Sequence, residues 1–298
     1  PATPAQAKEG WSLDAYLQLL MARARAEGVG EGTLQRMTAG LAPNYRVIEL
    51  DRGQPGAPTS TGYPPLAPYI ASHVDAARIR GGRDARASWS GSLRAIEREY
   101  GVPSEVLVAI WGHETAYGAV KGGFDLSQAL ATPAWEGRRR GWAEDQLIAV
   151  AHMIDNGYAT RDQLTGSWAG AMGQMQFIPT TYLERAVDFD GDGRRNIWTN
   201  NGDALASAAN LLARAGWQTG APTVIEVSVP ADFDVGRWNP DQNRLVSEWA
   251  MRGITQANGH AWSADGMMLS ARLELPAGIA GPGFLTFPNF RVIKRYNN

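Results

Sequence analysis

The sequence is informative first in what it lacks. It contains no cysteine, which excludes structural disulfides and thiolate metal sites and is compatible with either the cytosol or the periplasm. No run approaches the roughly 18 apolar residues that cross a bilayer. The formal net charge is −2, so charge alone gives no reason to expect nucleic acid or an anionic membrane surface as a partner. With 44% apolar and 19% charged residues, the chain is globular, and its ligands have to be inferred from particular sites.

The spacing of apolar residues predicts a mainly α chain of the α+β class. Ser12 is the expected N-cap of a first helix, which repeats apolar side chains every three or four positions. Further helices are predicted at residues 68–100, 103–117, 142–157, 178–186 and 203–215. The Pro- and Gly-rich residues 42–67 are expected to run as irregular surface chain. After Gly216 the pattern alternates, which predicts strands at 223–229, 266–276 and 283–287.

One carboxylate, Glu114, stands in the otherwise apolar and aromatic stretch AIWGHETAYG. On the predicted helix it shares a face with Leu107, Ile110 and Tyr117. Burial there would favour the neutral acid, and a protonated carboxylic acid is what glycosidic bond cleavage requires of a general acid. The alternative is structural, with Glu114 paired to an arginine or capping a loop. A zinc-protease motif is excluded, because it needs a second histidine at the position of Tyr117.

The stretch GSWAGAMGQMQFIPTTY, residues 166–182, combines small residues with neutral polar ones. Small residues let a backbone approach a ligand closely, and Ser167, Gln174 and Gln176 offer hydrogen-bonding groups suited to hydroxyl and acetamide groups. The alternative is a tight packing turn that has no ligand.

The stretch DFDGDGRRN predicts a calcium loop of the EF-hand type. Asp188, Asp190 and Asp192 occupy its first, third and fifth positions, and Gly193 occupies the sixth. Thr199 stands where such a loop places its bidentate glutamate, and Asp203 is the candidate to complete the ligand shell. A solvated acidic turn is the alternative.

Together and in this order, these three stretches resemble the lytic transglycosylase B family of bacterial peptidoglycan-cleaving enzymes, glycoside hydrolase family 103. The resemblance extends to NYRVIELDRGQP, YGVPSEVLVAI, ALAT and RVIKRYN, so it spans nearly the whole chain. It implies a lysozyme-like helical core, an N-terminal helical domain and a small C-terminal β-domain. The domains expected are an N-terminal helical region with its connecting loop (8–67), the catalytic core (68–220), the β-domain (221–290) and a return segment (291–298).

The same resemblance implies the activity and the residues that perform it. The family cleaves the β-1,4 bond between N-acetylmuramic acid (MurNAc) and N-acetylglucosamine (GlcNAc) without water, leaving a 1,6-anhydro ring, and its single catalytic acid matches Glu114. The positions that match substrate-binding residues are Tyr69, Trp142, Ser167, Gln176, Phe177, Tyr296 and Asn297. One structural Ca²⁺ is implied at Asp188, Asp190, Asp192, the Arg194 carbonyl and Asp203.

Two other functions stay open at this point. A hydrolytic muramidase would normally need a second carboxylate about 5–9.5 Å from the first, and a non-catalytic scaffold would bind peptidoglycan without turnover. The expected partners are peptidoglycan glycan strands, with cell-wall synthesis or divisome proteins as candidates and no nucleic acid. A monomer in the periplasm is expected, with an outer-membrane lipid anchor as a second form.

Overall fold

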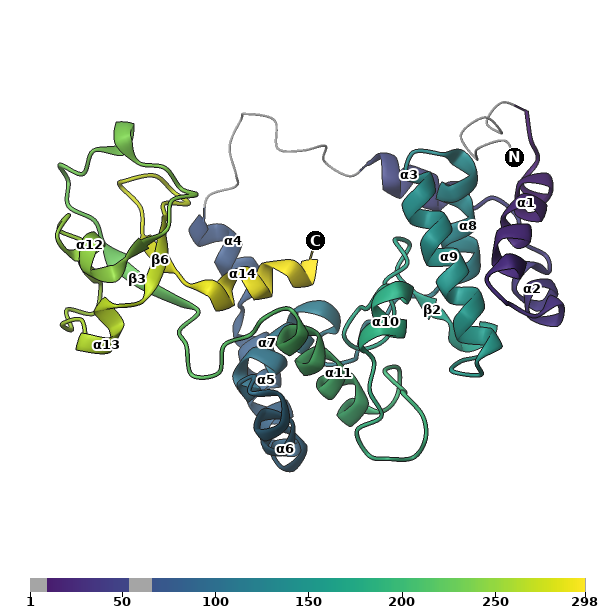
Figure 1. Ribbon diagram of the computed structural model, residues 1–298, viewed down its shortest axis with the longest axis horizontal. Coiled ribbons are helices and arrows are strands. Elements are labelled where there is room, and N and C mark those ends of the chain that lie inside the picture. The colour runs from purple at the N-terminus through teal and green to yellow at the C-terminus, as the bar shows by residue number, and fades with distance from the viewer. Residues whose placement is uncertain (1–9, 54–65, 298) are drawn as a thin grey trace. The chain divides into compact units, whose positions relative to one another are not determined.

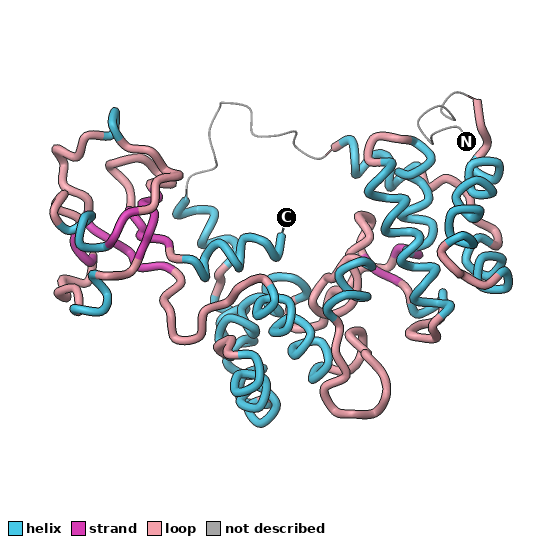
Figure 2. The backbone as a smooth tube through the Cα atoms, viewed as in Figure 1, coloured by secondary structure: helices cyan, strands magenta, loops and turns pink. Residues whose placement is uncertain are grey.

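The computed structural model describes residues 10–53 and 66–297 (Figure 1). Helices dominate, and most of the strands lie in the C-terminal third of the chain (Figure 2), which confirms the predicted mainly α, α+β class. The chain forms two compact units. The first unit contains the described residues within 1–57, 77–95 and 104–210, and the second unit contains those within 58–76, 96–103 and 211–298.

The first unit is helical. Its helices are α1 (Leu13–Ala26), α2 (Glu31–Thr38), α3 (Tyr45–Arg52), α5 (Ala76–Ser88), α7 (Ser104–Thr115), α8 (Leu126–Glu136), α9 (Arg140–Asp155) and α10 (Pro179–Arg185). Of these helices, α5 has its first residue, Ala76, in the second unit. Two more helices, α6 (Ser90–Tyr100) and α11 (Asn201–Arg214), begin in the first unit and end in the second. The strands β1 (Phe124–Asp125) and β2 (Thr165–Gly166) form a short antiparallel pair. Helix α9 is buried on all sides over residues 146–151, as expected of a helix at the centre of a core.

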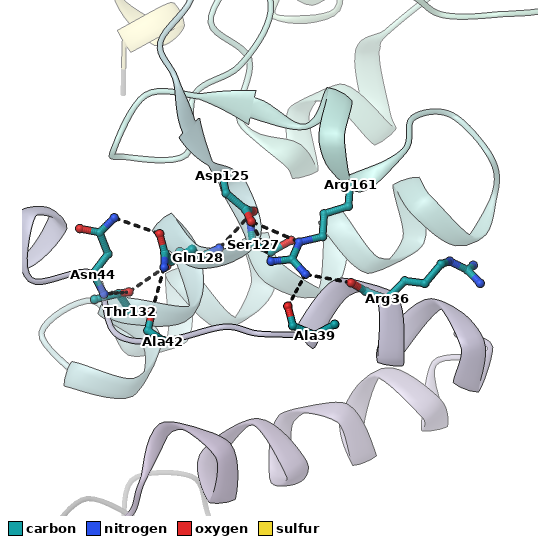
Figure 3. A network of polar contacts seen from close by, with 9 residues as sticks. All are labelled: Arg36, Ala39, Ala42, Asn44, Asp125, Ser127, Gln128, Thr132 and Arg161. Atoms are coloured by element: carbon teal, nitrogen blue, oxygen red, sulfur yellow. Dashed lines mark hydrogen bonds and ion pairs between the residues drawn. The ribbon is translucent and has the colours of Figure 1, made fainter.

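A polar network ties the α2–α3 segment to helix α8 (Figure 3). The Asp125 carboxylate caps the start of α8 by accepting from the backbone N–H groups of Ser127 and Gln128. It also accepts from the Arg161 Nε and Nη2 atoms at 3.2 and 2.8 Å. The Arg161 Nη1 atom donates to the backbone carbonyls of Arg36 and Ala39 at 3.0 and 2.6 Å, where α2 ends. One arginine thus joins the C-terminal end of α2 to the N-terminal end of α8.

The second unit contains a five-stranded antiparallel sheet in the order β4-β6-β7-β3-β5. Its strands are β3 (Val224–Ser228), β4 (Arg244–Leu245), β5 (Thr255–Gln256), β6 (Ser270–Glu274) and β7 (Gly283–Thr286). Helices α4 (Leu66–His73), α12 (Val246–Ala250), α13 (Ala264–Met267) and α14 (Pro288–Lys294) complete the unit. Leu273 and Leu285 face each other across β6 and β7, and both are fully buried in a cluster with Trp249 and Phe287.

Several elements differ from the sequence prediction. Residues 42–67 were expected to be irregular, but α3 lies within them and begins at Tyr45, with the side chain of Asn44 capping its first turn. The predicted helix 68–100 is divided into α4, α5 and α6. Helices α8 and α14 were not predicted, and the predicted helix 103–117 ends at Thr115. The strands predicted at 223–229, 266–276 and 283–287 correspond to β3, β6 and β7.

Among the described helices, none has both the length and the apolar content required to cross a lipid bilayer.

Candidate active site

Helix α7 places Glu114 at the margin of the first unit's interior. The helix begins at Ser104, directly after Pro103, whose fixed φ angle suits a helix start. Leu107, Trp111 and Thr115 point inward and are at most 3% exposed. Glu114, in the last turn, is half-buried. Its carboxyl therefore lies between the apolar interior and the surface, where it can still meet a ligand.

The Glu114 carboxyl is desolvated without compensation. Burial raises the pKa of Glu114 above its ordinary value, and no neighbouring charge among the described residues contributes to the shift. Within the described part of the chain, Glu114 makes no ion pair and accepts no hydrogen bond. Among those residues it is therefore neither paired to an arginine nor capping a loop, as the structural alternative would require. An acid in this environment holds its proton to higher pH than an exposed glutamate does, as a general acid requires.

A left-handed turn follows Glu114 and leaves Tyr117 half-buried beside the helix. Ala116 and Tyr117 have φ angles of 49° and 62°, so Tyr117 is not on the helical face where the sequence placed it. Its hydroxyl donates to the Arg78 carbonyl at 2.6 Å. A Cβ added at Gly112 would lie 2.5 Å from this ring. The glycine in the motif WGHE is therefore required by packing, because it makes room for the tyrosine that ends the helix.

Ser167 lies in a tight turn after β2. Its backbone N–H donates to the Ala171 carbonyl at 2.7 Å, and its hydroxyl accepts from the Ala171 N–H at 3.0 Å. The loop after α7 crosses this turn so closely that a Cβ on Gly122 would lie 2.2 Å from the Gly166 carbonyl oxygen. Gly122 also has a φ of 83°, which other residues adopt at a cost. Packing thus explains the small residues here, and the Ser167 hydroxyl hydrogen is still available to a ligand.

The two glutamines of this stretch differ in their surroundings. Gln176 is half-buried, has a left-handed φ of 50°, and donates from Nε2 to the Gly173 carbonyl at 2.9 Å. Gln174 is 4% exposed and hydrogen-bonded on both sides of its amide, so the expectation that it meets a ligand is wrong. Phe177 is 2% exposed, and its expected role in substrate binding stays a prediction.

Trp142 is half-buried on α9 and belongs to an arrangement that the sequence did not predict. The Arg139 guanidinium lies 4.6 Å from the centre of the Trp142 ring and 5.9 Å from that of Trp168. The buried Asp51 carboxylate lies 3.1 Å from the Arg139 Nε atom. Trp168 directly follows Ser167 in sequence. A cation between two indole rings thus lies beside the Ser167 turn, and only the run RRRGW could have indicated it.

Three carboxylates of the predicted calcium loop converge. Oxygen atoms of Asp188, Asp190 and Asp203 lie within 4.8 Å of one another. Asp203 is fully buried and accepts from the backbone N–H groups of Phe189 and Asn196 at 2.9 and 2.7 Å. Burial raises the pKa of Asp203, those two hydrogen bonds lower it, and the charges of Asp190 and Asp188 raise it again.

This oxygen set fits a hard cation, which would relieve the repulsion between the clustered charges. Asp203, the candidate to complete the ligand shell, belongs to this set. The Asp192 carboxylate is outside the set and accepts from the Arg194 N–H at 2.8 Å.

The remaining predicted residues belong to the second unit. Tyr69 on α4 is 46% exposed, and its ring stacks on that of His73 with 4.1 Å between the ring centres. Tyr296 is half-buried in a 3₁₀ turn that continues from α14. The side chain of Asn297 lies outside the described residues.

Comparisons with known proteins give consistent matches. The sequence profile of the family described as Transglycosylase SLT domain matches residues 12–298. The chain is 31% identical over 252 residues to the membrane-bound lytic murein transglycosylase B of Escherichia coli K12, covering 81% of this chain and 67% of that protein.

Solved structures match over nearly all of the chain. The structure of SltB3 from Pseudomonas aeruginosa, in complex with NAG-anhNAM-pentapeptide, matches with a TM-score of 0.91 and 40% identity, covering 97% of this chain and 76% of that one. The Escherichia coli lytic transglycosylase Slt35 in complex with calcium matches with a TM-score of 0.80 and 27% identity, covering 94% of this chain and 86% of that one.

Proposed function

The chain belongs to the Transglycosylase SLT domain family, and on that premise we propose that it is a peptidoglycan lytic transglycosylase whose catalytic acid is Glu114. The substrate bond is the β-1,4 linkage between MurNAc and GlcNAc, and the product carries a 1,6-anhydroMurNAc end. The observation that carries the proposal is the half-buried Glu114 carboxyl, which has a raised pKa and no charged partner within residues 10–53 and 66–297. The related SltB3 was crystallised with NAG-NAM-pentapeptide and with NAG-anhNAM-pentapeptide, which supports this substrate class.

One carboxyl group is sufficient for this reaction. Glu114 donates its proton to the glycosidic oxygen as the bond from C1 of MurNAc to that oxygen breaks. The acetamide of MurNAc stabilises the positive charge that develops at C1. The Glu114 carboxylate then takes the proton of the C6 hydroxyl while that oxygen forms its bond to C1. The proton returns to Glu114, and no water is consumed.

Neutral groups are suited to hold the sugar during these steps. The Ser167 hydroxyl accepts from the Ala171 N–H and donates to no other described residue, and Gln176 has a left-handed backbone conformation. Neither adds a charge that would lower the pKa of Glu114. We assign both to the reacting sugars, and Tyr69, Trp142, Tyr296 and Asn297 to the binding of the glycan. We also keep Phe177, which is 2% exposed, among the proposed substrate-binding residues.

We further propose one structural Ca²⁺ in the 188–203 loop. Asp188, Asp190 and Asp203 provide the converging oxygens, and the Asp192 carboxylate and the Arg194 carbonyl would complete the shell. The related Slt35 was crystallised in complex with calcium, which supports the choice of ion. The cation would hold the EF-hand-like loop and take no part in bond cleavage.

The family also supports a domain assignment and a location. We propose that residues 68–220 form the catalytic core, between an N-terminal helical region (8–67) and a β-domain (221–290), and that residues 291–298 return to the core. We propose the periplasm as the site of action, because peptidoglycan is the substrate and the Escherichia coli relative is described as membrane-bound. Cell-wall synthesis or divisome proteins are the proposed protein partners of a monomer.

Two alternatives are less well supported. A muramidase would place a second carboxylate near the first, yet no charged neighbour among the described residues influences Glu114. A scaffold that only binds peptidoglycan would have no need of a desolvated acid.

The substitution Glu114→Gln tests the proposal. It preserves the shape of the side chain and removes the transferable proton, so solubilisation of purified sacculi should fall at least about 10²-fold, the lower end of general acid contributions. Sedimentation with sacculi should show that binding survives. The control is Glu184→Gln, which changes an exposed glutamate on α10 and should leave turnover unchanged. Near-wild-type turnover of Glu114→Gln would rule out this acid.

A further inference from the structure

We propose that Gln174 is a positioning residue that fixes the last turn of α7, and with it Glu114, against the start of α11. The inference rests on the proposed function, since it assigns Glu114 the role of acid. Gln174 is 4% exposed, so it acts through Glu114's helix and does not contact the substrate.

The contacts of Gln174 on α7 lie on both sides of Glu114 in sequence. The Trp111 Nε1 atom donates to the Gln174 Oε1 atom at 3.0 Å, and the Thr115 hydroxyl donates to the Gln174 carbonyl at 2.7 Å. The Thr115 hydroxyl also accepts from the Gly118 N–H at 3.0 Å, which joins the turn after the helix to the same group. Trp111, three residues before Glu114, and Thr115, directly after it, are therefore both hydrogen-bonded to Gln174.

The contacts on the other side of Gln174 lead to the acidic loop. Its Nε2 atom donates to the Asn201 Oδ1 atom, at the first residue of α11, and its backbone N–H donates to the Ile197 carbonyl at 2.9 Å. The neighbouring Asn200 donates to Asp190 at 2.7 Å and accepts from the Asp203 N–H at 3.2 Å. A chain of hydrogen bonds thus connects the carboxylate cluster, through the start of α11 and Gln174, to α7, which carries Glu114.

The position requires the chemistry of an amide. One side chain has to accept from the indole and donate to the asparagine within a closed interior, and glutamine does both without a charge. A neutral group also leaves the environment of Glu114 uncharged. Space is tight as well, because a Cβ added at Gly118 would lie 2.4 Å from the Gln174 Oε1 atom. A hydrophobic residue of similar length would fill the volume and lose both hydrogen bonds.

A purely structural role is the competing explanation, and Gln146 provides the matched control. Gln146 is also 4% exposed, and its amide oxygen accepts from the Thr180 N–H at 3.1 Å and from the Thr180 hydroxyl at 3.0 Å. It joins α9 to α10 and has no contact with α7 among its hydrogen bonds. Loss of either amide should cost stability, whereas only Gln174 should affect catalysis.

The experiment compares Gln174→Met with Gln146→Met in the full chain on soluble glycan strands. Both should lower the melting temperature. Gln174→Met should reduce kcat by about 10-fold or more, because small misplacements of a catalytic group are costly, and leave KM within about twofold. It should also move the alkaline limb of the pH profile to lower pH, since a displaced Glu114 is better solvated. Gln146→Met should keep kcat within about twofold and the limb unchanged.

Asn201→Ala provides a milder variant that removes one hydrogen bond without a core substitution. It should reduce kcat in the same direction, and the double variant with Gln174→Met should be no slower than Gln174→Met alone, because both act on one path. Added Ca²⁺ should still raise the melting temperature of Gln174→Met as it does that of the wild type, since the carboxylate cluster is intact.

The outcomes separate this inference from the proposed function. Equal kcat for Gln174→Met and Gln146→Met, or additive losses in the double variant, would overturn the positioning role while leaving the function intact. A wild-type chain that does not cleave glycan strands would overturn the proposed function itself.

Discussion

The chemistry of Glu114 depends on where α7 ends. The left-handed residues Ala116 and Tyr117 stop the helix, and the acid remains in the last turn, half-buried and without a charged partner in the part of the chain that the structure describes. The sequence predicted both the residue and its desolvation from the apolar neighbours. It could not predict the turn, because two non-glycine residues with positive φ are uncommon and tertiary contacts of Tyr117, among them those with Gly112 and Arg78, help to stabilise them.

The raised pKa of Glu114 predicts a pH-dependent stability. Below the unfolded pKa of about 4.3, the group is neutral in both states and costs nothing. As pH rises towards the higher folded pKa, the unfolded chain ionises first, so stability falls and the loss is complete above the folded pKa. Glu114→Gln cannot ionise and should therefore melt at a higher temperature than the wild type near neutral pH, with the difference shrinking towards pH 4 or so.

Thermal unfolding of both proteins across this pH range checks the expectation. The prediction would be wrong if Glu114→Gln melted at or below the wild-type temperature near neutral pH, or if the difference between the two proteins did not change with pH.

Other residues of the site show how far sequence reasoning extends. Ser167 and Gln176 lie in the turn that the small residues predicted, and their roles toward a sugar stay predictions. Gln174 and Phe177 are of the residue types that line sugar sites, yet both are buried. Spacing within an irregular turn does not indicate which side chains point inward, because no helical or strand period applies there.

At the scale of elements, the Arg161 network should stabilise the first unit (Figure 3). Arg161 is 22% exposed and combines a charged pair with two backbone carbonyls that end α2. Arg161→Ala leaves those groups unsatisfied and should lower the free energy of unfolding by about 1–3 kcal/mol.

The matched control is Arg46→Ala. Its pair with Glu49 has side chains 65% and 67% exposed, so a change below about 1 kcal/mol is expected. Urea unfolding of both variants measures the difference. Equal losses in the free energy of unfolding for Arg161→Ala and Arg46→Ala would contradict a stabilising role of the Arg161 link between α2 and α8.

The acidic loop is the second element with a measurable consequence. Ca²⁺ bound to Asp188, Asp190 and Asp203 should raise the melting temperature, with about 2.7 kcal/mol of stabilisation at 100 times the dissociation constant. Chelation should reverse the gain, and Asp203→Asn should remove most of the response. The control Asp162→Asn changes an exposed acid outside the loop and should respond to calcium as the wild type does. A calcium response that survives Asp203→Asn would place the ion elsewhere.

Most long helices with regular amphipathic spacing were predicted, and α3 and α8 are among the helices that were not. Helix α3 follows a Pro-rich linker pattern and depends on its Asn44 cap and on contacts of Asn44 with Gln128 and Thr132. Helix α8 contains Pro133, which usually argues against a helix interior. In both cases tertiary contacts override the local signal.

At the scale of the whole molecule, the mainly α class and the late β unit follow from composition and periodicity. The division of the chain into two units cannot be predicted from composition and periodicity. Residues 96–103, from the helical centre of the sequence, group with the C-terminal β unit, because contacts between distant segments decide such a grouping and sequence spacing does not report them.

The reaction type is the central claim, and the mass of the products tests it most directly. Purified sacculi would be digested in water enriched in ¹⁸O, and the released muropeptides analysed by mass spectrometry. If the C6 hydroxyl of MurNAc attacks C1, as proposed for a single acid at Glu114, the dominant products are lighter by one water than muramidase products and carry no ¹⁸O. Reducing MurNAc ends that contain ¹⁸O would contradict the account, because water would then be the nucleophile.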